Sequence, residues 1–335
     1  MSSAKKPIVA VTQGDPAGIG PEICVATMQS QEIYNECNPF MIGSIPIIER
    51  AMNVNKCDFK VNKISKPSEA KFQYGTIDVL ETGPYDCNSI EWGKVQKLAG
   101  QMSLDYVMKS IELGMNKEID AVSTAPIHKE AIKLAGCKLP GHTEIYQEET
   151  HSDYGLTMFH THNLRVFFVS RHMSVIDACA YANKERVLAC VEQIHREFTA
   201  LGIKNPRIAV AALNPHGSDN GLFGHEERDN LIPAVLAAKE KGINAIGPVP
   251  ADSVFHLGKL GNYDAILSLY HDQGHIACKT LDFERSITIT FGLPFMRSSV
   301  DHGTAFDIAG TGKAGSISMI ESTLRVAQYW KMKNN

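Results

Sequence analysis

Short runs rich in β-branched residues alternate with longer helix-like segments along this chain, and the alternation limits the folds open to it. The runs are PIVAVT (7–12), AVST (121–124), RVFFVS (165–170), RIAVAAL (207–213), DAILSLY (264–270) and SITITF (286–291). The helix-like segments cover 21–28, 94–113, 128–135, 184–201 and 226–241. This order predicts an α/β fold with a largely parallel sheet. At about 150 residues per domain, 335 residues suggest two domains or one large α/β unit with insertions.

The charge balance limits the classes of binding partner that we expect, and the cysteines indicate the cellular compartment. The 37 acidic and 33 basic side chains give a net charge of −4, so we expect neither nucleic acid nor an anionic membrane as a partner. The eight cysteines are scattered and never form a C-x-x-C pair. With no secretory leader and no apolar stretch of roughly 18 to 20 residues, the sequence predicts a cytoplasmic protein with reduced thiols.

Three of the 13 histidines stand within three residues of the end of a strongly apolar run. His172, His216 and His271 each stand among turn residues, and ligands of open α/β sheets bind outside the carboxyl ends of the strands. Three imidazoles suit Zn²⁺, Co²⁺ or Ni²⁺ with positions left open for a substrate. The alternative is that each is a surface histidine in a turn. His160 and His162 alternate on one expected strand, and we interpret both as facing solvent, with metal binding as the alternative.

Other polar stretches have both a functional and a structural interpretation. The loop Gly14–Glu22 could face an anion with its backbone N–H groups, or it could be a tight strand-to-helix turn. His142 and Thr143 lie in the compact loop PGHTE, where Thr143 could instead cap a helix. Lys279 and Arg297 could bind a phosphate or carboxylate, or they could be surface charges.

Long stretches of the sequence resemble one family, the 4-hydroxythreonine-4-phosphate dehydrogenases of pyridoxal phosphate (pyridoxine) biosynthesis with their threonate and erythronate 4-phosphate dehydrogenase relatives. The matching stretches are TQGDPAGIGPEI (12–23), STAPIHKEAIKLAG (123–136), PGHTE (140–144), LNPHGSDNGLFGHEE (213–227), GPVPADSVF (247–255), YHDQGH (270–275) and GLPFMRSSVDHGTAFDIAGTGKA (292–314). They occur in the same order over nearly the whole chain.

The resemblance implies a fold like that of the isocitrate and isopropylmalate dehydrogenases. It implies two α/β/α domains with a central cleft, residues 1–130 with 295–335 forming a discontinuous first domain and 131–294 the second. It also implies a homodimer with a shared active site, and NAD or NADP held without a Rossmann fingerprint. The resemblance identifies no cofactor-binding residues.

The resemblance also implies roles for single residues. One divalent metal (Zn, Co, Mg or Mn) is expected on His172, His216 and His271, shared across the dimer interface. Substrate contacts are expected from His142, Thr143, Lys279 and Arg297, and from Thr288, which stands where the family usually has Asn in a V-N-I-T segment. Lys279 is expected to stabilise an enolate, and Asp272 to orient His271 or relay a proton.

The implied reaction is the oxidation and decarboxylation of a 4-phosphorylated 3-hydroxy acid. The first candidate substrate is 4-phosphohydroxy-L-threonine, which would yield 3-amino-2-oxopropyl phosphate. The alternative is D-threonate or D-erythronate 4-phosphate, which would yield dihydroxyacetone phosphate and CO₂. Two other classes stay open, a metal-dependent phosphoester hydrolase and a sugar-phosphate binding protein without turnover.

Overall fold

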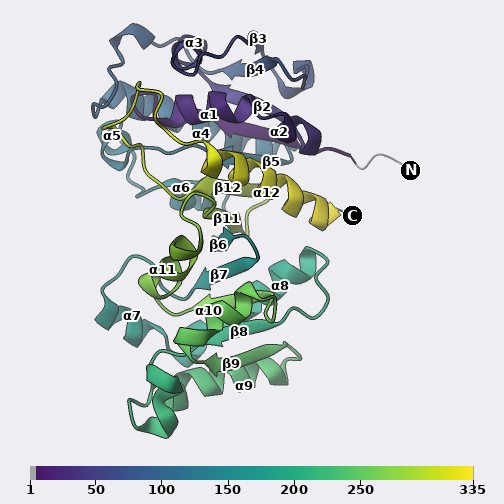
Figure 1. Ribbon diagram of the computed structural model, residues 1–335, viewed down its shortest axis with the longest axis vertical. Coiled ribbons are helices and arrows are strands. Elements are labelled where there is room, and N and C mark those ends of the chain that lie inside the picture. Colours follow the sequence, from purple (N-terminus) through teal and green to yellow (C-terminus); the bar gives the residue numbers. More distant parts are fainter. Residues whose placement is uncertain (1–4, 335) are drawn as a thin grey trace. The chain divides into compact units, whose positions relative to one another are not determined.

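The computed structural model describes residues 5–334, and the chain separates into two compact α/β units (Figure 1). The first unit runs to Gly155 and resumes at Ile287, and the second spans Leu156–Ser286. These limits differ from the expected domains, 1–130 with 295–335 and 131–294. The reason is local packing: helix α6 (His142–Glu149) contacts α4 (Lys97–Met115), and β11 (Ile287–Phe291) pairs with β12 (Met296–Val300).

Seven strands form the sheet of the first unit, in the order β3-β4-β2-β1-β5-β12-β11. Apart from the antiparallel pair of β11 and β12, neighbouring strands run parallel. The strands not yet given bounds are β1 (Ile8–Thr12), β2 (Asn38–Gly43), β3 (Lys60–Ile64), β4 (Thr76–Glu81) and β5 (Ala121–Thr124).

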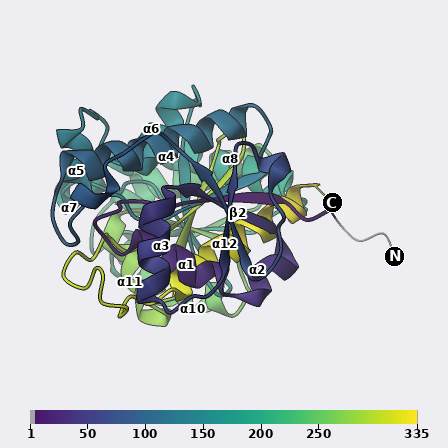
Figure 2. The ribbon, with the colours of Figure 1, turned by 90° about the horizontal axis from the view of Figure 1, so that it is seen from above.

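Helices cover both faces of this sheet. One group comprises α1, α2, α3 and α12, and the other comprises α4, α5 and α6, on opposite sides of β2 in the view of Figure 2. The remaining bounds are α1 (Gly20–Met28), α2 (Gln31–Glu36), α3 (Ile45–Val54), α5 (Lys129–Leu134) and α12 (Ile317–Asn334). Short 3₁₀ turns cover Pro67–Glu69 and Cys87–Ser89.

The second unit repeats this plan with five strands in the order β6-β7-β10-β8-β9. The pair β6 and β7 is antiparallel and the other pairs are parallel. The strands are β6 (Leu156–Thr161), β7 (Leu164–Phe168), β8 (Ile208–Ala211), β9 (Ala245–Val249) and β10 (Ala265–Ser268). The helical elements are α7 (Val175–Tyr181), α8 (Lys184–Ala200), η3 (Pro215–Gly221), η4 (Glu227–Leu231), α9 (Ile232–Glu240), α10 (Ala251–Lys259) and α11 (His271–Leu281).

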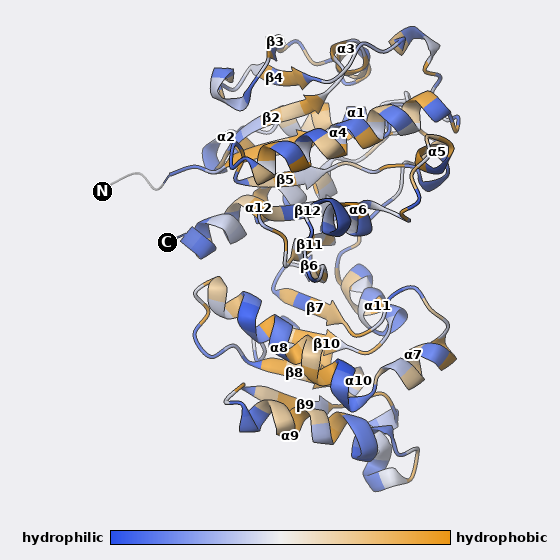
Figure 3. Cartoon of the chain, turned by 180° about the vertical axis from the view of Figure 1, so that it is seen from behind, coloured by the Kyte–Doolittle hydropathy of each residue, from blue (hydrophilic) through white to orange (hydrophobic). Residues whose placement is uncertain are grey.

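Apolar periodicity explains why these segments form these elements. The strands that the helices cover, such as β8 and β10, are hydrophobic along their length (Figure 3), as expected for parallel strands buried on both faces. Helix α8 buries one stripe at helical spacing, which comprises Val187, Cys190, Val191, Ile194 and Phe198. Its N-cap Asn183 accepts a hydrogen bond from the backbone N–H of Arg186, a cap that contributes about 1 kcal/mol.

The predicted α/β class is confirmed, and all six predicted runs form strands. The prediction for His160 is wrong. This residue lies on β6 and is 4% exposed, and its Nε2 lies 2.5 Å from the carbonyl oxygen of His162. All six residues of β6 are buried, so neither face of this strand is open to solvent, and the sequence of β6 alone does not encode that coverage. Across residues 5–334 no helix is long and apolar enough to cross a membrane.

Candidate active site

The first unit holds a buried arginine among hydroxyl groups. Arg297 on β12 is 3% exposed, and its guanidinium donates to Thr290 Oγ1 at 2.9 Å, Thr124 Oγ1 at 3.1 Å and Thr143 Oγ1 at 3.4 Å. The guanidinium carbon lies 5.0 Å from the ring centroid of Tyr146, a cation–π distance. We call these five residues the arginine cluster. A guanidinium oriented in this way is suited to a phosphate or carboxylate, which it can bind through two N–H groups.

Strand pairing builds this cluster. In the antiparallel pair of β11 and β12, Thr290 stands opposite Arg297, and β5 carries Thr124 along the other edge of β12. Helix α6 supplies Thr143 and Tyr146 from its first turns. The cluster therefore joins residues of three neighbouring strands and of helix α6, which come from separate parts of the chain.

His142, the first residue of α6, completes this region. Its Nε2 is buried and makes no hydrogen bond with any residue in the described range 5–334. Burial, with a smaller contribution from the charge of Arg297, holds the pKa of His142 well below its usual value. The neutral ring thus keeps one nitrogen available for a hydrogen bond to a substrate.

Thr288, the expected contact on β11, has a different position from Thr290. Its Oγ1 donates to the carbonyl oxygen of Ser299 at 3.3 Å, and Thr290 makes the bond to Arg297. Both threonines lie on one face of the strand, since side chains two residues apart share a face. The sequence contained a signal for Thr290, its period-two relation to Thr288, but not the register that sets it against Arg297.

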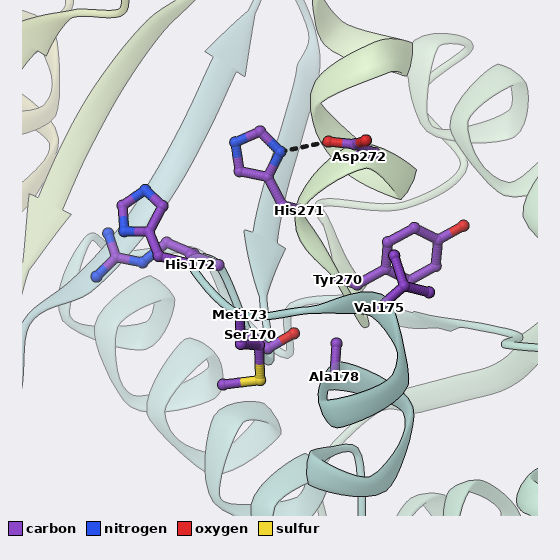
Figure 4. Close-up of a pocket in the computed structure, with 9 residues that line it drawn as sticks. Ser170, His172, Met173, Val175, Ala178, Tyr270, His271 and Asp272 are labelled. Atoms are coloured by element: carbon purple, nitrogen blue, oxygen red, sulfur yellow. Dashed lines mark hydrogen bonds and ion pairs between the residues drawn. The ribbon is translucent and has the colours of Figure 1, made fainter.

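The second unit holds a cavity of about 280 Å³ at the carboxyl ends of β7 and β10. It is lined by Ser170, Arg171, His172, Met173, Val175, Ala178, Tyr270, His271 and Asp272. We call it the histidine cavity. The ring centroids of His172 and His271 are 6.2 Å apart, and Figure 4 shows the two rings side by side. They meet because β7 and β10 are parallel neighbours, so their following loops emerge at the same edge.

Asp272 contacts one of these rings. Its Oδ1 lies 2.6 Å from Nδ1 of His271, on the side of the ring away from His172 (Figure 4). A carboxylate in this place accepts the Nδ1–H, which leaves the Nε2 lone pair of His271 for a metal. The structure therefore contains the contact between Asp272 and His271, and the role of Asp272, to orient His271 or to relay a proton, stays a prediction.

His275, one helical turn later on α11, cannot share a metal with His271. The two rings stack with centroids 3.7 Å apart and an interplanar angle of 11°. A metal lies in the plane of each imidazole that binds it, so two rings stacked face to face cannot direct a nitrogen to the same ion. Nδ1 of His275 is 2.8 Å from the carbonyl oxygen of His271, and burial lowers the pKa of His275 to about 4. His275 is thus a packing partner of His271.

His216 is not gathered with the other two expected ligands. It follows β8, and in the described range 5–334 no group of three or more His, Cys, Asp or Glu side chains lies close enough to hold a metal ion. His172 and the oriented His271 fit a divalent metal as two nitrogen donors. Lys279 lies on α11, with its Nζ 5.2 Å from the ring centroid of Phe283.

Gln273 was not among the predicted site residues, although its side chain links the ends of two strands in this region. Its Oε1 accepts the backbone N–H of Leu269 at 2.8 Å, and its Nε2 donates to the carbonyl oxygen of Ala212 at 2.8 Å. It thereby ties the end of β10 to the end of β8, the strands that precede His271 and His216.

Comparison with known proteins decides the family. The model of the pyridoxal phosphate biosynthetic protein PdxA matches residues 35–326, most of the chain. The chain belongs to the PdxA family. A protein of Halalkalibacterium halodurans, provisionally named D-threonate 4-phosphate dehydrogenase, is 49% identical over 97% of each chain. A Clostridium botulinum protein with the same provisional name is 47% identical, again over 97% of each chain.

Solved structures of PdxA-family relatives agree in fold. The 4-hydroxythreonine-4-phosphate dehydrogenase of Klebsiella pneumoniae superimposes with a TM-score of 0.91 at 38% identity, covering 99% of this chain and 100% of that one. That of Burkholderia phymatum gives a TM-score of 0.86 at 37% identity, covering 97% and 98%. The chain therefore belongs to a family of dehydrogenases, oxidoreductases that act on a CH–OH group.

Proposed function

We propose that this PdxA-family chain oxidises and decarboxylates D-threonate 4-phosphate with NAD or NADP as hydride acceptor. The arginine cluster carries the proposal, because a buried guanidinium with neutral neighbours, close to an unpartnered imidazole nitrogen, suits a small phosphorylated acid. The sequence puts 4-phosphohydroxy-L-threonine first and D-threonate 4-phosphate second, and this proposal reverses that order. It is supported by the names of relatives that are 47% to 49% identical, compared with 37% to 38% for the two structures named for hydroxythreonine phosphate.

Residues of the first unit would bind the acidic groups of the substrate. Arg297 would bind its phosphate or carboxylate, and Thr143 would exchange its contact with Arg297 for one with the substrate. His142 would form a hydrogen bond through the Nε2 atom that is unpartnered in the described structure. Thr288 would contribute one polar contact that helps to distinguish substrates.

Residues of the second unit would hold a divalent metal, Zn, Co, Mg or Mn. When bound, such an ion lowers the pKa of a hydroxyl that it contacts and stabilises developing negative charge on oxygen. His172, His216 and His271 would be its ligands, with a second copy of the chain supplying the donors that one chain does not gather. Asp272 would keep the Nδ1 proton of His271 in place, and so keep Nε2 available.

Exposed apolar side chains support a homodimer with a shared site. Ile176 is 83% exposed and Val175 59% exposed, close in sequence to His172, and Leu222 is 72% exposed near His216. Apolar groups gathered near functional residues are typical of protein interfaces.

The proposed reaction balances without a further co-reactant. Bound NAD or NADP would supply the acceptor for the C3 hydride, and with loss of the C3 hydroxyl proton the substrate would become a β-keto acid. The C1–C2 bond then breaks, CO₂ leaves, and its electron pair passes to C2 as an enolate that takes up a proton. Lys279 would stabilise the enolate through its ammonium group. The product would be dihydroxyacetone phosphate.

4-Phosphohydroxy-L-threonine is the second candidate, and its amino product would be 3-amino-2-oxopropyl phosphate. It differs from the threonate at C2, where an amino group replaces the hydroxyl. The structural relatives named for this substrate favour it.

The test is NADH or NADPH formation with D-threonate 4-phosphate, D-erythronate 4-phosphate and 4-phosphohydroxy-L-threonine, each with and without added divalent metal. We expect the largest kcat/KM with D-threonate 4-phosphate, dependence on metal, and one CO₂ per NADH. A larger kcat/KM with the hydroxythreonine would reverse the choice of substrate. Phosphate release without reduction of the cofactor would instead favour a hydrolase.

A further inference from the structure

The segment after β8 has an unusual backbone. From His216 to Asn220, five consecutive residues have positive φ angles between 45° and 67°, and Gly217 is the one glycine among them. L-residues disfavour this left-handed conformation because Cβ approaches the following carbonyl oxygen. Such a turn persists only where surrounding contacts hold it, and these strained segments are frequent at functional sites.

A buried carboxylate grips the chain just before this left-handed turn. Glu227 is 1% exposed, and its Oε1 accepts the backbone N–H groups of Leu213 at 2.8 Å and Asn214 at 2.7 Å. Its Oε2 accepts Nδ2 of Asn214 at 2.8 Å. Charge-assisted hydrogen bonds of this kind are stronger than neutral ones.

Asn214 connects Glu227 to the left-handed turn through hydrogen bonds. While its N–H and side chain bind Glu227, its carbonyl oxygen accepts the N–H of Gly217 at 3.1 Å. The adjacent Glu226 adds one contact, from its Oε2 to the same Asn214 Nδ2 at 2.7 Å. The turn closes on itself through the N–H of Phe223 and the carbonyl oxygen of Ser218 at 3.1 Å.

We propose that Glu227 is the positioning residue for His216. Its carboxylate fixes Leu213 and Asn214, and so fixes the point from which the left-handed turn presents the exposed imidazole. The proposal rests on the proposed function, in which His216 is a metal ligand. Glu227 itself is buried beneath the turn and would not touch the metal.

The experiment uses the full-length protein in its metal-free form with Glu227→Ala and Glu227→Gln. Two quantities are measured: hydrogen–deuterium exchange of a peptide covering 213–222, and Co²⁺ affinity from the visible absorption of the bound ion. We expect Glu227→Ala to speed exchange in this peptide about 10-fold or more. Co²⁺ affinity should fall about 10- to 100-fold, the usual loss when a residue that orients a ligand is removed. Glu227→Gln should lose less exchange protection and less Co²⁺ affinity, because its Oε1 can still accept hydrogen bonds from both backbone N–H groups.

Glu22→Ala is the matched control. Glu22 is also a buried carboxylate, 2% exposed, and accepts the backbone N–H groups of Gly310 and Gly312 in the first unit. Its loss should speed exchange around 308–313, while exchange in 213–222 and Co²⁺ affinity stay within about twofold of the wild type.

The outcomes separate this proposal from the proposed function. If His216→Ala abolishes Co²⁺ binding but Glu227→Ala leaves both exchange and affinity unchanged, the positioning role is overturned. If His216→Ala binds Co²⁺ like the wild type, the metal role of His216 is lost, and exchange in 213–222 alone decides whether Glu227 holds the turn. If Glu227→Ala does not fold, Glu227→Gln and Asn214→Ala, which removes the Oε2 contact, provide the same two measurements.

Discussion

The arginine cluster of the first unit and the histidine cavity of the second differ in how much of each is complete within one chain. The cluster is buried, and three threonine hydroxyls already bind a guanidinium that is 3% exposed. In the cavity, two imidazoles meet at the edge of a sheet, and the third expected ligand is not gathered with them. The proposed anion site is thus preorganised in a single fold unit, whereas the proposed metal site needs donors from elsewhere.

The largest expected effect falls on the histidine cavity. His271→Ala removes the imidazole that Asp272 orients, and we expect kcat/KM to fall about 10²- to 10³-fold, as for loss of one strong stabiliser of oxyanion charge. Circular dichroism should show an intact fold, because the side chain is partly exposed. Steady-state kinetics across metal concentrations measure the effect. Turnover at the wild-type rate in this variant would show that His271 has no role in the proposed metal site.

The buried polar groups of the first unit should make its stability depend on pH. Burial raises the pKa of Asp15 from 3.8 to about 6, against smaller opposing contributions from the N–H groups of Ala17 and His128. Between pH 4 and 6 the folded chain keeps a proton that the unfolded chain releases, so this residue lowers stability as pH rises.

Asp15→Asn removes that penalty, since the amide oxygen can still accept the N–H of Ala17. Relative to wild type, the variant should gain up to about 3 kcal/mol in the free energy of unfolding between pH 4 and pH 7.5. Urea unfolding at both pH values measures the difference. Parallel stability curves for the two proteins would contradict the prediction.

Arg297→Lys tests whether the arginine cluster acts separately from the histidine cavity. An ammonium cannot reach all three threonine hydroxyls and bind an anion bidentately, so we expect KM for the phosphorylated substrate to rise about 10- to 100-fold. Co²⁺ affinity should not change. A fall in Co²⁺ affinity alongside the rise in KM would show that the two regions are coupled.

Asp272→Asn should have a smaller effect, and it should change metal affinity rather than KM. Replacing the carboxylate weakens the hold on Nδ1 of His271, and we expect metal affinity to fall about 10-fold, the lower end for such partners because Asp272 is 68% exposed. KM extrapolated to saturating metal should stay near the wild-type value. Titration with Co²⁺ measures the affinity, and an unchanged value would remove the orienting role.

Thr288→Asn should produce the smallest change. It restores the residue that the family usually has, at a half-buried position whose hydroxyl bonds the carbonyl oxygen of Ser299. We expect the ratio of kcat/KM for 4-phosphohydroxy-L-threonine over D-threonate 4-phosphate to rise by less than about 10-fold, since one polar contact changes. A ratio identical to that of the wild type would place substrate choice elsewhere.

The sequence by itself determined the α/β class, the six strands built on β-branched runs, and the family, because periodicity and long ordered motifs are local properties of the chain. It also placed His172 and His271 at the carboxyl ends of strands, and these two rings do meet. The sequence also indicated a strand at His160, but it did not indicate that both faces of this strand, β6, are buried.

Only the tertiary structure decided how these pieces meet. Thr290 rather than Thr288 binds Arg297 because the register of β11 against β12 arises from pairing between strands, not from either strand alone. The left-handed turn at His216 runs against local preference and coincides with the grip of Glu227 on Leu213 and Asn214. In both cases the deciding contacts join residues whose relation appears only after the chain has folded.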